Sequence, residues 1–149
     1  MNPSVAIVLI NTGSPDAPTA PAVKAYLAEF LNDTRVVELP RWKWWPILHG
    51  IILNTRPAKS AERYKIVWTP EGSPLILHSQ AIVDRLTERC TDLPVVFYSA
   101  MCYGSPSIPS VMAKIAVTGI KKVLCVPMFA QYSSHTSAGC VESVFKVCM

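Results

Sequence analysis

Residues 120–137 join a continuous apolar run to a polar loop rich in hydroxyl groups. An apolar run without polar alternation is typical of a parallel strand that is covered on both faces. The loop then lies at the carboxyl end of that strand, which is where ligands bind in open α/β sheets. We therefore interpret residues 131–137 as the wall of a binding site, with a plain solvated turn as the alternative.

The rest of the chain repeats this pattern of a buried strand, a turn and a helix. Apolar strands are predicted at residues 5–10 and 93–103, and amphipathic helices at residues 20–31, 107–118 and 139–149. Short connections between such elements predict an α/β fold with a parallel sheet flanked by helices, in a single domain over residues 1–149. Gly13 alone makes neither a dinucleotide fingerprint nor a phosphate loop, which argues against a flavodoxin-like nucleotide binder.

Composition narrows the class of protein further. Half of the 149 residues are hydrophobic and 16% are charged, which excludes a disordered tail. The net charge of +4 comes from scattered basic residues, so no nucleic-acid partner is expected. A mildly cationic surface suits anionic small molecules or an anionic membrane surface.

The five cysteines are odd in number and none are spaced as Cys-x-x-Cys. The amino-terminal residues also lack the basic and long apolar regions of a secretion signal. Both features point to a reducing cytosol, and therefore to a cytoplasmic protein.

Residues 41–53 form the densest aromatic segment of the chain. Trp42, Trp44 and Trp45 stand beside Arg41 and Lys43, which is the composition of an anchor at a membrane interface. The alternative is an ordinary core or dimer-contact helix. The segment is too interrupted to span a bilayer, which needs about 20 apolar residues.

Two further helices follow the aromatic segment. Residues 56–67 begin near Pro57 and are rich in cations, so this helix is either a solvated face or a surface that binds carboxylates. After a turn over residues 68–74 comes an amphipathic helix. Its apolar stripe is predicted to be core and comprises Leu75, Ile82, Val83, Leu86 and Cys90.

These motifs, taken in order, resemble the bacterial type of the ferrochelatase family, and the resemblance covers nearly the whole chain. The opening Asn-Thr-Gly-Ser-Pro at residues 11–15 is similar to the family's Asn-Leu-Gly-Thr-Pro. The other matching segments are residues 26–31, 35–38, 44–53, 64–68 with 72–74, 101–108 and 131–133.

The resemblance implies a Rossmann-like, chelatase-type fold and a lyase that inserts ferrous iron into a porphyrin during haem biosynthesis. Iron is then a substrate, and neither a resident cofactor nor an iron–sulfur cluster is expected. The porphyrin is protoporphyrin IX or coproporphyrin. The resemblance places the following residues along the porphyrin cleft: Thr12, Arg56, Tyr64, Ser73, Cys102, Tyr103, Gln131, Tyr132 and Ser133. It makes Trp42, Trp44 and Trp45 part of a lip that can contact the inner membrane peripherally.

Three departures from the family pattern qualify these expectations, and the mildest is Ala130, which stands where the family usually has a proline before Gln-Tyr-Ser. Cys102 stands where the family usually has an arginine in Met-Arg-Tyr-Gly. Family members are also longer, and their metal-binding histidine and its acidic partner lie in the second half, beyond Met149. The chain therefore corresponds to an amino-terminal half, which we expect to be inactive alone and prone to self-association. The alternative function is an inactive porphyrin-binding remnant or module.

Overall fold

The computed structural model describes residues 3–148. The chain divides into two compact units, one formed by Met1–Gly13 with Leu75–Met149 and the other by Ser14–Pro74. We refer to them as the sheet unit and the helical unit and describe each by itself. The assignment of the chain to one domain stays a prediction.

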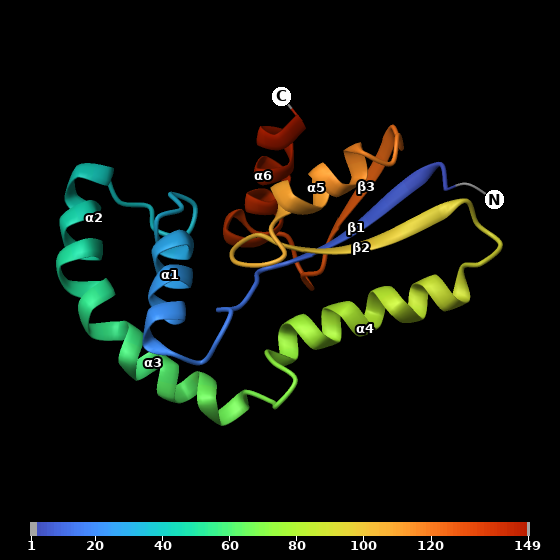
Figure 1. Cartoon of the computed structure of the whole chain (residues 1–149). Helices are drawn as coiled ribbons and strands as arrows, with labels where there is room; N and C mark the ends of the chain where they lie inside the picture. The colour runs from blue at the N-terminus through green and yellow to red at the C-terminus, as the bar shows by residue number, and fades with distance from the viewer. Residues whose placement is uncertain (1–2, 149) are drawn as a thin grey trace. The chain divides into compact units, whose positions relative to one another are not determined.

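The sheet unit is built on three parallel strands, β1 (Val5–Asn11), β2 (Val95–Met101) and β3 (Lys122–Pro127), in the order β2-β1-β3. Val8 of β1 lies opposite Tyr98 of β2 and Cys125 of β3. Helices α5 (Ile108–Ala116) and α6 (Gly139–Cys148) lie on one face of the sheet, and α4 (Pro74–Arg89) lies on the other (Figure 1). This arrangement confirms the predicted α/β fold with a parallel sheet flanked by helices.

The core of the sheet unit follows the two-residue alternation of the strands. Ala6, Val8 and Ile10 point to the face that carries α5 and α6, where they pack with Ala100. From the helices, this core receives the buried side chains of Ile108, Val111, Ile115 and Cys140. Helix α5 starts where Ser107 accepts a hydrogen bond from the backbone N–H of Ser110 at 3.3 Å. A serine cap of this kind satisfies a donor that the first turn leaves free.

Two expectations about burial in the sheet unit are wrong. β3 was expected to be covered on both faces, but Leu124 is 54% exposed. The central strand is β1, whereas β3 forms one end of the described sheet. An end strand packs against fewer neighbours, so its apolar run is only partly buried. On α4, Val83 is buried as predicted, but Ile82 is exposed.

The helical unit contains α1 (Ala20–Leu31), α2 (Arg41–Ile47), the π-helical turn η1 (Leu48–Ile52) and α3 (Leu53–Val67). Its core gathers around Leu31, Leu48 and Leu53. The predicted helix start near Pro57 is wrong, because α2, η1 and α3 follow one another without a break and place Pro57 inside α3. Proline removes one backbone donor, and here the continuous helix tolerates that loss. Within the described residues, no helix is both long and apolar enough to cross a bilayer.

Candidate functional site

The carboxyl ends of β1 and β2 are held together beyond the last residues of both strands. The backbone N–H of Cys102 donates to the carbonyl of Asn11 at 2.8 Å, and that of Tyr103 donates to the carbonyl of Thr12 at 3.0 Å. The N–H of Thr12 donates in turn to the side-chain oxygen Oδ1 of Asn11 at 2.8 Å. Three of the predicted cleft residues, Thr12, Cys102 and Tyr103, therefore lie side by side at this edge of the sheet.

Gly13 allows this close approach of the two loops. Its φ of +108° lies in the left-handed region that favours glycine. A Cβ atom built on Gly13 would collide with the backbone carbonyl oxygen of Tyr103. Only glycine fits here, so the turn after β1 is fixed by sterics as well as by hydrogen bonds.

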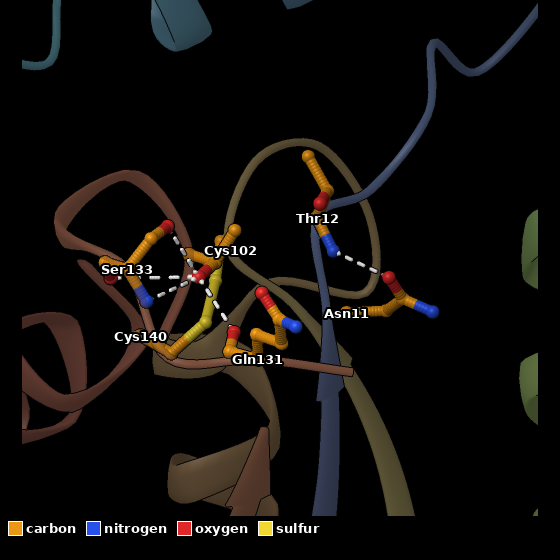
Figure 2. The surroundings of a disulfide bond; sticks show 7 residues. Asn11, Thr12, Cys102, Gln131, Ser133 and Cys140 are labelled. Atoms are coloured by element: carbon orange, nitrogen blue, oxygen red, sulfur yellow. Dashed lines mark hydrogen bonds between the residues drawn. A yellow bond between two sulfur atoms is a disulfide. The ribbon is translucent and has the colours of Figure 1, made fainter. Parts of the chain in front are cut away.

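The loop after β3 reaches the same edge, because the N–H of Met128 donates to the carbonyl of Ile10 at 2.8 Å. Ser133 then caps the π-helical turn η2 (Ser134–Ala138). The N–H of Ser133 donates to Oγ1 of Thr136 at 3.1 Å, and the two hydroxyl oxygens are 2.7 Å apart. Figure 2 shows Gln131 and Ser133 of this loop near Cys102 and Thr12. Gln131 and Tyr132 are exposed, whereas the Ser133 hydroxyl serves the cap.

Cys102 does not present a thiol to this edge, because its sulfur is bonded to that of Cys140 on α6 (Figure 2). The two Cα atoms are 5.8 Å apart, within the usual range for disulfides. No disulfide was expected from the sequence. The two-residue spacing of Val96 and Tyr98 on β2, continued to Cys102 just after the strand, could have placed Cys102 on the face of α5 and α6.

The helical unit carries the remaining predicted cleft residues. Arg56 and Tyr64 lie on α3, with Arg56 exposed and Tyr64 half-buried. The Tyr64 ring meets the Trp68 ring edge-on, with centroids 6.3 Å apart, and burial raises the pKa of the Tyr64 phenol. Ser73 is buried just before α4. The structure thus brings together the members of the predicted set that belong to the sheet unit, and places these three in the other unit.

A hollow of about 310 Å³ lies beside Tyr64 and is lined by Ser60, Arg63, Tyr64 and Val67. Arg63 is one of the cations in the predicted helix at residues 56–67 and was not among the predicted cleft residues. It lies seven residues after Arg56, which is two helical turns, so both guanidinium groups belong to the same side of α3. This seven-residue spacing, visible in the sequence, could have identified Arg63 as a candidate binding residue together with Arg56.

The three tryptophans of α2 have different environments. The indole N–H of Trp44 donates to the carbonyl of Leu31 at 2.7 Å, and its ring packs on the core of the helical unit. Trp42 and Trp45 are 74% and 58% exposed. The Lys43 ammonium lies 4.9 Å from the Trp42 ring centroid, and the Trp45 ring contacts His49. Trp44 is thus partly buried against the core, whereas Trp42 and Trp45 are the more exposed members of the predicted lip.

Metal-binding groups do not gather in the part of the chain that the structure describes. Across residues 3–148 there is no group of three or more His, Cys, Asp or Glu side chains that could hold a metal ion. His49, His78 and His135 are each exposed. The candidate site of this chain is therefore a wall of polar and aromatic groups.

Comparisons with known proteins agree with the resemblance. The family model described as ferrochelatase matches residues 4–149. Curated ferrochelatases that are similar to this chain include that of Dechloromonas aromatica, 53% identical over 95% of the chain, and that of Nitrosomonas europaea, 49% identical over 95%. The ferrochelatase of Chromobacterium violaceum is 46% identical over 97%. The chain spans 39 to 41% of the length of these relatives. With a family match over almost all of its residues, this chain belongs to the ferrochelatase family.

Proposed function

We propose that the protein to which this chain belongs inserts ferrous iron into a porphyrin, and that this chain supplies part of the porphyrin-binding wall. The observation that carries the proposal is the family match over residues 4–149. The gathering of Thr12, Tyr103 and Gln131 at the carboxyl edge of a parallel sheet supports it, because this edge is the usual ligand site of such sheets.

The chemistry of a porphyrin fits the side chains of the candidate site. A flat apolar macrocycle needs an apolar or aromatic wall, and each unit carries a tyrosine of this kind: the half-buried Tyr64 in the helical unit and the buried Tyr103 in the sheet unit. Its carboxylate arms need donors, and a guanidinium such as that of Arg56 or Arg63 can bind a carboxylate through two hydrogen bonds. Metal insertion also requires a base that accepts two pyrrole protons, and a wall that holds the ring in a distorted shape.

For the 149-residue chain alone we propose porphyrin binding without iron insertion. The described residues hold no cluster that could present a metal ion to the ring. The alternative function is a porphyrin-binding module that has no metallation activity in any context. Both functions predict the same behaviour for this chain alone and differ only in whether the longer protein inserts iron. Iron insertion by the protein that carries this chain would contradict the alternative.

The test is an anaerobic titration of protoporphyrin IX and, separately, of coproporphyrin into the chain, with and without ferrous iron. Fluorescence quenching should report binding, while the absorption bands of the free base stay unchanged when iron is added. A chain that binds neither porphyrin would contradict the proposal. Metalloporphyrin formed faster than in buffer would show that the described residues can metallate after all.

Arg56 and Lys59 offer a matched pair for this titration, because both are exposed cations on α3. Arg56→Gln should weaken porphyrin binding by roughly tenfold, which corresponds to the loss of one exposed charge-assisted hydrogen bond. Lys59→Gln removes the same charge and should leave the affinity unchanged. Equal losses in both variants would indicate general electrostatic attraction and contradict a specific contact at Arg56.

We also propose a cytoplasmic protein that contacts the inner membrane through Trp42 and Trp45. The two exposed indoles next to Lys43 have the composition of an interfacial anchor. Binding to vesicles of anionic phospholipid should fall by about tenfold in the double variant Trp42→Ala, Trp45→Ala. Ile66→Ala, which removes an exposed apolar side chain of α3, is the control and should bind as the parent does. Absence of vesicle binding by the parent chain would contradict this lip.

Self-association of the isolated chain is a further proposal. Val141 and Phe145 lie one turn apart on α6 and are both exposed, and exposed apolar patches usually mark contacts. Sedimentation should show dimers or larger species at micromolar concentration. A monodisperse monomer with little binding of hydrophobic dye would contradict self-association.

A further inference from the structure

The pair Cys102 and Cys140 joins two segments of the candidate site that are separate in sequence. Cys102 is the first residue after β2, and Cys140 is the second residue of α6, directly after the turn η2. We propose that this pair is a redox-sensitive tether. When oxidised it holds the segment 131–138 against the end of β2, and when reduced it releases that segment. The effect on porphyrin binding rests on the proposed function, whereas the tether itself does not.

The two ends of the tether are anchored differently. On the β2 side, the N–H of Cys102 donates to the carbonyl of Asn11, so this sulfur is attached to the sheet. On the other side, Ser133 and Thr136 bond to each other, and Thr136 Oγ1 lies 3.5 Å from the carbonyl of Gln131. These hydrogen bonds shape the segment internally, and the disulfide joins that shaped segment to the sheet (Figure 2).

Burial determines which sulfur a reductant can reach. Cys140 is 0% exposed, whereas Cys102 is partly exposed. The thiolate of a small dithiol therefore attacks the Cys102 sulfur, and the electron pair of the broken bond passes to the Cys140 sulfur, which takes a proton. The second sulfur of the dithiol then closes a cyclic disulfide and releases Cys102 as a thiolate, which also takes a proton. Two electrons and two protons reach the protein, and the dithiol is oxidised.

The reverse step uses a small disulfide such as glutathione disulfide, which accepts the two electrons and two protons and leaves as two thiols. Cys125 is the competing thiol, since it lines a hollow of about 210 Å³ together with Cys140. Burial, and secondly the neighbouring Cys148, raise the pKa of the Cys125 thiol. Less of it is then present as the attacking thiolate, which favours the original pair over exchange.

Both redox states are compatible with the fold. Cys102 and Cys140 pack with the apolar core of the sheet unit, and reduced cysteines behave there as small hydrophobic residues. In a reducing cytosol, disulfides are usually transient and take part in redox sensing or catalysis. A pair that is compatible with the fold in either state, and has one partly exposed cysteine, meets those conditions.

The test compares the whole chain after treatment with glutathione disulfide and after treatment with dithiothreitol. Alkylation followed by mass spectrometry should find three reactive thiols, Cys90, Cys125 and Cys148, in the oxidised chain unfolded for labelling. It should find all five in the reduced chain. Amide hydrogen exchange in residues 131–138 should become about tenfold faster on reduction. Porphyrin affinity should fall by about threefold to tenfold, because the loop is no longer pre-organised.

Variants separate the tether from a general effect of reductant. Cys140→Ala should show the fast exchange of the reduced chain under both treatments, and Cys102→Ser provides a second test if the first variant folds poorly. Cys90→Ser is the control, because Cys90 is free, and it should respond to reductant as the parent does.

Three results would overturn the tether: five alkylated thiols after oxidation, peptide maps that pair Cys125 with either partner, or exchange rates that do not change on reduction. If porphyrin binds neither state while alkylation and exchange respond as expected, the proposed function fails and the tether stands. Equal porphyrin affinity in two states that do differ in exchange would remove the link between the tether and binding.

Discussion

The carboxyl edge of the sheet and the tryptophan-rich helix α2 are both dense in side chains that could bind a ligand, but they are fixed to different degrees. At the sheet edge, backbone bonds join Cys102 to Asn11 and Tyr103 to Thr12. In α2, the Trp44 indole donates to the Leu31 carbonyl and the Arg41 guanidinium donates to the Asn32 carbonyl, while Trp42 and Trp45 are exposed. Aromatic density alone therefore does not identify a pre-organised site, whereas backbone pairing does.

The two regions also differ in what maintains their geometry. The sheet edge depends on one glycine and on a covalent bond, so a single change there should affect several candidate residues together. The helical unit depends on apolar packing around Leu48 and on one indole hydrogen bond. Substitutions in this unit should have smaller and more local effects.

The largest effect is expected for Gly13→Ala. The new Cβ collides with the carbonyl oxygen of Tyr103, and alanine also disfavours the φ of +108°. Steric overlap and backbone strain together should lower the free energy of unfolding by roughly 4 kcal/mol. Urea denaturation followed by circular dichroism measures this loss.

Gly119→Ala is the matched control for Gly13→Ala. Gly119 also has a positive φ, +77°, but a Cβ there meets no atom within 4 Å. Its cost should be strain alone, about 1 kcal/mol. Similar losses in the two variants would contradict the view that the sheet edge is fixed by the close approach to Tyr103.

Trp44→Phe should have an intermediate effect. The phenyl ring keeps most of the packing but leaves the Leu31 carbonyl without its indole donor and opens a small cavity. We expect a loss of about 2 kcal/mol in the free energy of unfolding. Trp42→Phe changes an exposed ring and should stay within about 0.5 kcal/mol of the parent. If both variants unfold alike in urea, the distinction between the hydrogen-bonded Trp44 and the exposed Trp42 is wrong.

The smallest effect concerns Tyr26, which is buried on α1. Burial, and then the neighbouring Tyr64 and Glu29, raise the pKa of its phenol well above the ordinary value of 10.0. The folded chain therefore keeps this proton when the unfolded chain has lost it. The resulting stability is fully present below pH 10 and is lost as the pH rises toward the folded-state pKa. At about pH 11 the loss should be about 1.4 kcal/mol.

Unfolding free energies at about pH 9 and about pH 11 test this for the parent, Tyr26→Phe and Tyr132→Phe. Tyr26→Phe should lose less stability between the two pH values than the parent. Tyr132 is exposed, and its variant should follow the parent. An unchanged alkaline loss in Tyr26→Phe would show that another group, such as Tyr64, is responsible.

The sequence by itself determined the sheet and the turn after its first strand. Apolar and β-branched residues predicted β1 and β2 correctly, because strands that are largely buried leave few polar positions. The helix at Ala20–Leu31 and the helix near Ser107 followed from their apolar spacing. The ordered motifs also identified the family, since each is a local property of the chain.

Only the tertiary structure decided which of these side chains meet. Cys102 and Cys140 are 38 residues apart, and neither spacing nor number indicated that α6 returns to the end of β2. Local composition could not separate Trp44 from Trp42 and Trp45, because that difference depends on where α1 ends beside α2. Leu124 is exposed for the same reason, since the position of β3 at one end of the sheet follows from strand order. Burial and pairing between distant segments depend on how the whole chain packs, and local patterns carry no record of that packing.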